Sequence, residues 1–206
     1  MSNSKPFRIA INGYGRIGQC VLRALYENGY RDHLQVVAIN ELSDIDTIAH
    51  LTRYDSTHGR FRGDIAVEGD DLVVNGDRIR VLRHPDPADL PWRLLDVDLV
   101  LECSGSFSDR PTAQKHIDAG AQRLLFSQPA ESDVDRTVVF GVNDAELTSQ
   151  DVIVAAASCT TNCLVPVIKV LDDALGVEQG STTTIHAAMN DQPVICLLYT
   201  SPSPRD

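Results

Sequence analysis

Apolar and polar positions along the chain follow two periods, one typical of buried strands and the other of amphipathic helices. Short apolar runs occupy Phe7–Asn12, Leu34–Asn40 and residues 97–103, 123–127, 137–140 and 152–157. Apolar residues recur at helical spacing from residue 20 to a stop at Asn28-Gly29, and again over residues 44–53, 112–119 and 164–175. Strands that alternate with helices predict an α/β fold with a doubly wound, mostly parallel sheet.

Three stretches depart from this alternation. Residues 65–67, 72–74 and 78–82 are short alternating strands, and Asn75-Gly76 is typical of the turn of a hairpin. Residues 54–61 form a polar loop, and residues 181–186 are rich in β-branched side chains, which favours a strand.

A glycine-rich turn follows the first strand. Gly13, Gly15 and Gly18 stand in the order GxGxxG between a strand and a helix, and Glu41 ends the next strand. This context is typical of a dinucleotide-binding turn, although glycines of an ordinary turn would give the same letters. The helix start would face the pyrophosphate, with Arg16 adding a charge. A carboxylate at Glu41 would accept hydrogen bonds from the ribose and repel a 2′-phosphate, so NAD is favoured over NADP.

A second candidate site lies between the last apolar strand and the helix that follows it. Cys159 would begin that helix, where free N–H groups and the helix dipole stabilise a thiolate, the nucleophilic form of cysteine. His186, on the β-rich stretch, is the candidate base. Both residues are equally compatible with ordinary structural roles. A disulfide between Cys159 and Cys163 is not expected, and no metal site is predicted, because no Cys/His pairs with zinc-finger spacing occur.

Composition narrows the range of partners. The chain has 206 residues, 43% of them hydrophobic, and a formal net charge of −11. An acidic balance argues against nonspecific binding to nucleic acid or anionic membranes. No apolar run is long enough to span a membrane and no signal peptide is evident, so a cytoplasmic location is expected. Five cysteines without regular spacing also fit a reducing compartment.

Taken together, the motifs resemble the phosphorylating glyceraldehyde-3-phosphate dehydrogenase superfamily. The resemblance rests on residues 12–18 (NGYGRIG), 54–61 (YDSTHGRF) and 158–163 (SCTTNC), and on the later His186. It implies NAD as cofactor, a phosphorylated aldose as substrate and a homotetramer as assembly. It also implies roles for individual residues: Cys159 as nucleophile, His186 as its activating base, Ser158 and Thr160 at the substrate, Arg16, Ile17 and Glu41 at the adenosine half of NAD, and Ser104, Gly105 and Ser127 nearer the nicotinamide.

Within the superfamily the chain is similar to erythrose-4-phosphate dehydrogenases. Asn40-Glu41-Leu42, residues 126–129 (FSQP) and Met189 carry this similarity. Glycolytic members usually have a threonine at the Met189 position, and a thioether cannot donate that hydroxyl's hydrogen bond to phosphate. The implied reaction oxidises erythrose 4-phosphate to 4-phosphoerythronate, for pyridoxal phosphate synthesis, through a thioester that water releases. The glycolytic reaction and a catalytically silent NAD-binding fragment are the alternatives.

The resemblance divides the chain into three parts. Residues 1–158 are expected to form the NAD-binding domain, and residues 159–195 the start of a truncated α+β substrate domain. Residues 196–206 have the character of a foreign tail, the alternative being a divergent native end. A basic residue that relatives often carry after residue 82 is replaced by Pro85, so that contact stays unassigned. With its substrate domain incomplete, the chain itself is expected to be inactive.

Overall fold

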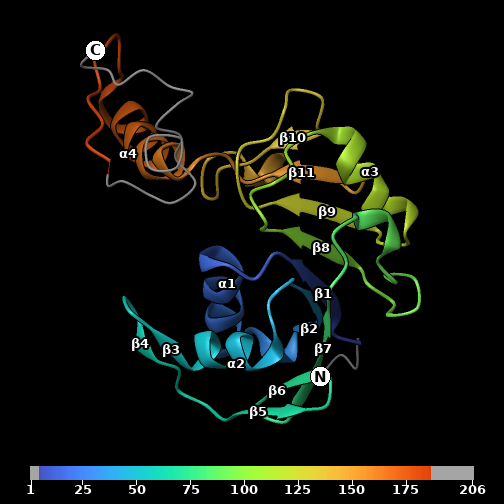
Figure 1. Cartoon of the computed structure of the whole chain (residues 1–206). Coiled ribbons are helices and arrows are strands. Elements are labelled where there is room, and N and C mark those ends of the chain that lie inside the picture. Colours follow the sequence, from blue (N-terminus) through green and yellow to red (C-terminus); the bar gives the residue numbers. More distant parts are fainter. Residues whose placement is uncertain (1–4, 187–206) are drawn as a thin grey trace, which may run out of the picture.

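The computed structural model describes residues 5–186. In that part of the chain nine strands form one sheet in the order β10-β11-β9-β8-β1-β2-β7-β6-β5, and β3 and β4 form a separate pair. The seven strands from β10 to β7 run parallel to their neighbours, whereas β5, β6 and β7 pair antiparallel. The α/β fold with a mostly parallel, Rossmann-like sheet is therefore confirmed (Figure 1).

The strands have the following bounds: β1 Phe7–Asn12, β2 Leu34–Asn40, β3 Tyr54–Asp55, β4 Gly59–Arg60, β5 Ile65–Glu68, β6 Asp71–Val74, β7 Asp77–Leu82, β8 Leu99–Glu102, β9 Arg123–Phe126, β10 Arg136–Thr137 and β11 Ile153–Ala155. The α-helices are α1 Arg16–Glu27, α2 Ile45–Arg53, α3 Arg110–Asp118 and α4 Cys159–Leu175, and three short 3-10 turns cover Tyr30–Asp32, Pro87–Asp89 and Asp144–Glu146.

Two apolar clusters cover the two faces of the sheet. On one face Leu22 of α1 and Ile48 of α2 pack on Ile11 and Ile39 of the central strands. On the other face a second cluster contains Ala113 of α3, Trp92 and Phe126. It also contains Ala10 and Ala38, which directly precede Ile11 and Ile39 in the two strands. Because successive side chains of a strand point to opposite faces, the continuous apolar runs β1 and β2 supply both clusters. The sheet is thus doubly wound.

The expected elements agree with the structure in their order, and four differ in detail. The polar stretch 54–61 contains the short β3–β4 hairpin, with Tyr54 opposite Arg60. β10 ends at Thr137 rather than at residue 140, because Val139 N–H donates to the side chain of Asn143 instead of to a strand. α4 begins at Cys159, as expected for the nucleophile, and its first turn precedes the apolar stripe that was expected from residue 164.

The fourth difference concerns residues 181–186, for which a strand was expected. They form no strand in the structure, and each of them is exposed, Ile185 to 97%. A strand needs a hydrogen-bonded neighbour, and none of the described strands pairs with this stretch. His186 is therefore held by an irregular segment and not by a sheet.

α4 extends away from the sheet (Figure 1). None of its residues is buried within the described part of the chain. None of the described helices is both long and apolar enough to cross a membrane.

Candidate functional site

The carboxyl ends of three adjacent strands form a polar row in the middle of the sheet. The register places Asn12 of β1 beside Asn40 of β2 on one side and beside Glu102 of β8 on the other. Asn40 Nδ2 donates to Asn12 Oδ1 (2.7 Å), and Asn12 Nδ2 donates to Glu102 Oε2 (2.5 Å). β1 is the strand at which the chain's direction of winding reverses, the place where such sheets bind ligands.

A cavity of about 310 Å³ opens at this edge, a volume within the range of ligand pockets. It is lined by the polar row's Asn12 and Asn40, by parts of the glycine turn and by residues of the neighbouring loops, in full Asn12, Gly13, Gly15, Asn40, Glu41, Leu42, His84, Pro85, Cys103, Ser104, Ser106 and Phe107. Gly13, Gly15, Glu41 and Ser104, which the sequence predicted for the cofactor, thus meet at one cavity.

The three glycines of the turn stand in three different environments. Gly13 has φ +86°, and a Cβ there would lie 2.4 Å from the backbone of Ser104. A Cβ on Gly18 would lie 2.4 Å from Gly13 O, so the start of α1 packs closely on the turn. A Cβ on Gly15 would meet no atom within 4 Å, and Gly15 caps α1. The open position therefore lies where a phosphate would approach the free N–H groups of a helix start.

Glu41 is held by the glycine turn itself. Its Oε2 accepts from Tyr14 N–H (2.9 Å), and its Oε1 lies 3.3 Å from both the N and the Oγ of Ser43. A carboxylate oxygen has further lone pairs, so these contacts orient Glu41 at the cavity without using up its capacity as an acceptor.

Glu102 is a buried carboxylate beneath the cavity, and the sequence reasoning did not single it out. It is 0% exposed and accepts from Ser104 N (2.8 Å) and Ser104 Oγ (2.5 Å), as well as from Asn12. His116 Nε2 lies 3.4 Å away without a hydrogen bond, while its Nδ1 accepts from Trp92 Nε1 (2.9 Å). An acid near the end of the apolar run 97–103 was the signal, because an acid is almost never fully buried without partners.

Other residues predicted for the cofactor do not line the cavity. Arg16 pairs with Asp55 and contacts Ser56 Oγ at 3.3 Å, and Ile17 is 48% exposed. Ser127 continues from β9, its N–H donating to Glu102 O (3.0 Å), and neither it nor Gly105 is among the lining residues. For these residues the cofactor contact stays a prediction.

The predicted nucleophile stands at the first position of α4. Ser158 caps the helix, its Oγ accepting from Thr161 N–H (3.0 Å) and lying 3.0 Å from Thr160 Oγ1. The preceding Ala157 has φ +60°, which is strained for a residue with a Cβ and turns the chain sharply from β11 into the helix. This turn presents Cys159 at the helix start, with its side chain exposed.

Cys159 Sγ lies 3.4 Å from His186 Nε2, across 27 residues of sequence. The hydrogen bond with His186 lowers the pKa of the Cys159 thiol below its ordinary value, and the N–H of Thr160 acts in the same direction. Cys163, one turn further on, is also exposed, and the four cysteines among the described residues are free. The expected thiol–imidazole pair is thus formed, and a 159–163 disulfide is not. Neither member of the pair lines the cavity at the glycine turn.

Comparison with known families adds the decisive observation. Residues 7–110, just over half of the chain, match the family described as glyceraldehyde 3-phosphate dehydrogenase, NAD binding domain. The chain belongs to the glyceraldehyde 3-phosphate dehydrogenase family. A second match covers residues 158–201 and is to the C-terminal domain of the same family. It begins at the cap of α4 and runs past Ile195, where the sequence resemblance was expected to stop.

Family membership makes NAD the cofactor of this chain and supports an NAD-dependent dehydrogenase of this family. The cavity residues fit that cofactor: an open glycine at a helix start suits a pyrophosphate, and Glu41 suits ribose hydroxyls. Met189, on which part of the similarity to erythrose-4-phosphate dehydrogenases rests, lies outside the described residues, as does the stretch 196–206.

Proposed function

We propose that the protein oxidises D-erythrose 4-phosphate to 4-phosphoerythronate through a covalent intermediate on Cys159, with His186 as its base. The observation that supports this reaction is the 3.4 Å contact between Cys159 Sγ and His186 Nε2 at the start of a helix. The sequence similarity at Asn40-Glu41-Leu42 and Met189 supports the choice of substrate within the family.

The chain's own residues carry the steps as follows. His186 takes the thiol proton of Cys159, and the thiolate adds to the aldehyde carbon to give a thiohemiacetal. N–H groups at the start of α4 stabilise the oxyanion that develops. Bound NAD would supply the hydride acceptor for this oxidation, and Cys159 would then hold the oxidised carbon as a thioester. Water then attacks the thioester, which releases the acid and restores the thiol.

Ser158 and Thr160 flank the nucleophile and support a role at the substrate. Their hydroxyls lie 3.0 Å apart, and Ser158 Oγ also caps the helix that presents Cys159. We expect them to contact hydroxyl groups of the sugar, and we place the substrate domain from residue 159 onward.

The glycolytic reaction is the second candidate, because both family matches are to glyceraldehyde 3-phosphate dehydrogenase domains. The two reactions differ in the group that releases the thioester. Inorganic phosphate would do so in the glycolytic reaction, whereas water suffices in the proposed one.

The proposal is tested by the protection of Cys159 and by NADH formation. Erythrose 4-phosphate should slow the alkylation of Cys159 at lower concentration than glyceraldehyde 3-phosphate does, a readout that does not require turnover. NADH formation is measured on the protein extended by a complete substrate domain, because the chain as given is expected to be inactive. It should need no inorganic phosphate and should be lost in Cys159→Ser but not in the matched control Cys163→Ser.

Two results would contradict the proposed reaction, and a third concerns the assembly alone. Preference for glyceraldehyde 3-phosphate with a strict need for phosphate would support the glycolytic reaction. NAD binding without any effect of either sugar on Cys159 would support a silent NAD-binding protein. A monomer in light scattering would contradict the homotetramer that we expect, without bearing on the chemistry.

A further inference from the structure

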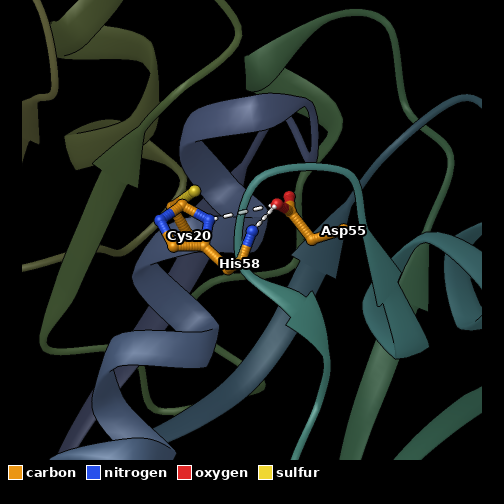
Figure 2. Close-up of side chains that lie close together, drawn as sticks. All are labelled: Cys20, Asp55 and His58. Atoms are coloured by element: carbon orange, nitrogen blue, oxygen red, sulfur yellow. Dashed lines mark hydrogen bonds and ion pairs between the residues drawn. The ribbon is translucent and has the colours of Figure 1, made fainter.

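A second group of chemically reactive side chains lies outside the residues that line the cavity. Among the described residues, Cys20, Asp55 and His58 each place one potential metal ligand within 4.8 Å of the other two. Cys20 comes from α1, Asp55 ends β3, and His58 lies in the turn between β3 and β4 (Figure 2). Neither the NAD site nor the Cys159–His186 pair uses any of the three.

Asp55 is the fixed member of this group. Its side chain is only 6% exposed, and its Oδ1 accepts from the N–H groups of Thr57 (2.8 Å) and His58 (2.6 Å). The backbone N–H of His58 in particular holds the pKa of the Asp55 carboxyl far below its usual range. The carboxylate is therefore charged and aimed before any ligand arrives.

The imidazole of His58 already stands at the spacing that two ligands of one metal ion adopt. His58 Nδ1 lies 3.1 Å from Asp55 Oδ1. Zinc bonds to nitrogen and oxygen of about 2.0–2.2 Å at a tetrahedral angle place the two ligand atoms about 3.4 Å apart. An ion could thus replace the hydrogen between these atoms with little movement of either side chain.

The Cys20 thiol requires a larger adjustment. A tetrahedral zinc site places sulfur about 3.6 Å from its nitrogen or oxygen neighbours, whereas the ligand atoms here lie within 4.8 Å of one another. The difference is at most about 1.2 Å, which a rotation of the half-exposed His58 ring or the Cys20 side chain supplies.

We propose that Cys20 Sγ, Asp55 Oδ1 and His58 Nδ1 bind one Zn²⁺ ion, with water as the fourth ligand. Thiolate and imidazole are ligands of zinc and not of magnesium or calcium, which take oxygen. Binding converts the Cys20 thiol to a thiolate and releases its proton to solvent. Sequence spacing carried no such signal, because Asp55 and His58 lie 35 and 38 residues after Cys20 and meet it only in the folded chain.

Arg16 links this group to the glycine turn. Its guanidinium pairs with the other oxygen of Asp55, so a zinc ion would share that carboxylate with an existing cation. Repulsion between the two cations weakens binding relative to a site without the arginine. We therefore expect moderate affinity, which is measurable with the bare ion.

The experiment must separate this group from the other thiol–imidazole pair, since Cys159 and His186 can also hold a metal. The whole chain carrying Cys159→Ser is therefore the starting protein. It is titrated with Co²⁺, whose thiolate charge-transfer absorption reports a cobalt–sulfur bond, and then with Zn²⁺, which displaces the cobalt. One equivalent of each should bind.

Replacing single ligands then identifies the site. Cys20→Ser should abolish the thiolate absorption and weaken zinc binding at least tenfold, and His58→Gln should weaken it comparably. Cys163→Ser in the same background is the matched control and should change neither reading, because Cys163 lies one turn into α4. Thermal melting without metal checks that each variant is folded.

The proposal is overturned if the starting protein shows no thiolate absorption with Co²⁺, or if that absorption survives in Cys20→Ser. Should His58→Gln fail to fold because the β3–β4 turn needs it, Cys20→Ser alone decides the question.

Discussion

α1, which packs on the sheet, and α4 contain the same kind of apolar pattern. The apolar side chains are buried in α1 and partly exposed in α4. In α1, Leu22 and Leu25 lie three residues apart and are 0% and 8% exposed. In α4, Ile168 and Leu171 have the same spacing and are 38% and 46% exposed. An apolar stripe predicts a helix in both cases, but only for α1 do the described residues supply the surface that covers it.

The difference matters because α4 carries the nucleophile. The cavity at the glycine turn is built from strand ends fixed by two apolar clusters. Cys159 and His186 are instead held by a cap, a strained turn and their mutual contact. The cofactor site should therefore be stable wherever the sheet is folded, while the geometry of the thiol pair depends on local interactions.

The largest expected effect is a difference in the stability lost when one leucine is replaced by alanine in α1 and in α4. Leu22→Ala removes a fully buried side chain and should lower the free energy of unfolding by about 3 kcal/mol. Leu171→Ala removes a half-exposed one and should cost about 0.5 kcal/mol or less. Urea denaturation measures both.

Equal losses from these two variants would show that α4 is covered as α1 is, and the contrast between the regions would fail. Leu25→Ala provides a control, since its near-complete burial predicts a loss similar to that of Leu22→Ala.

A second, smaller effect tests the glycine turn. Gly13→Ala forces a Cβ to 2.4 Å from the Ser104 backbone at φ +86°, so it should cost about 2–3 kcal/mol of stability and weaken NAD binding strongly. Gly15→Ala meets open space, so it should cost about 1 kcal/mol or less, yet still weaken NAD binding. Calorimetric titration with NAD and thermal melting separate the two effects.

The interpretation of Gly15 as the place of phosphate approach fails if Gly15→Ala binds NAD as tightly as the unaltered chain. A Gly13→Ala variant of full stability would instead contradict the close packing of the turn on Ser104.

A third prediction is that Cys159, Cys163 and Cys103 differ in the rate at which iodoacetamide alkylates them at a given pH. The pKa of Cys159 is lowered by His186, so its thiolate persists to lower pH than an ordinary thiolate, and Cys159 should react faster than Cys163 around neutral pH. Burial raises the pKa of Cys103 to about 11, so Cys103 should stay unlabelled there. Peptide mapping of iodoacetamide-treated protein gives the three rates.

His186→Ala should shift the Cys159 profile to higher pH and lower its rate near neutrality severalfold. Cys163 serves as the internal control, and its rate should not change. Unaltered labelling of Cys159 in His186→Ala would show that the 3.4 Å contact does not activate the thiol.

These contrasts also show what could be read from the sequence. β1 and β2 were predicted with their observed bounds, because continuous apolar runs on either side of a glycine turn and a helix are typical of the first two strands of a dinucleotide-binding sheet. The meeting of Cys159 with His186 was predicted from chemistry and spacing, although the strand expected to carry His186 does not form. A strand forms only where a neighbouring strand pairs with it, and the local sequence pattern does not show whether such a neighbour exists. Residues 181–186 have none among the described strands.

Other contacts depend on packing between segments that sequence spacing does not connect. Arg16, whose contact with the cofactor stays a prediction, pairs with Asp55, because the β3–β4 hairpin within the expected loop brings that carboxylate beside α1. Glu102 and His116 meet beneath the cavity for a similar reason, since β8 and α3 pack together only in the finished fold.

The smallest predicted effect compares the caps of two helices. Asp44 caps α2 by accepting from Thr47 N–H (2.8 Å), and Ser158 caps α4 by accepting from Thr161 N–H (3.0 Å). Replacing either cap by alanine removes about 1 kcal/mol from its helix. α2 packs into an apolar cluster of the sheet, so Asp44→Ala should lower the global free energy of unfolding by that amount.

Ser158→Ala should leave global unfolding unchanged, because no α4 residue is buried among the described residues. Its effect should appear instead as faster hydrogen exchange of the Asn162 amide, which donates to Ser158 O, and as slower alkylation of Cys159. Hydrogen exchange resolved by residue distinguishes the two patterns. If Ser158→Ala lowers global stability as much as Asp44→Ala does, α4 unfolds together with the sheet. The nucleophile would then share the stability of the cofactor site, contrary to the contrast drawn from their burial.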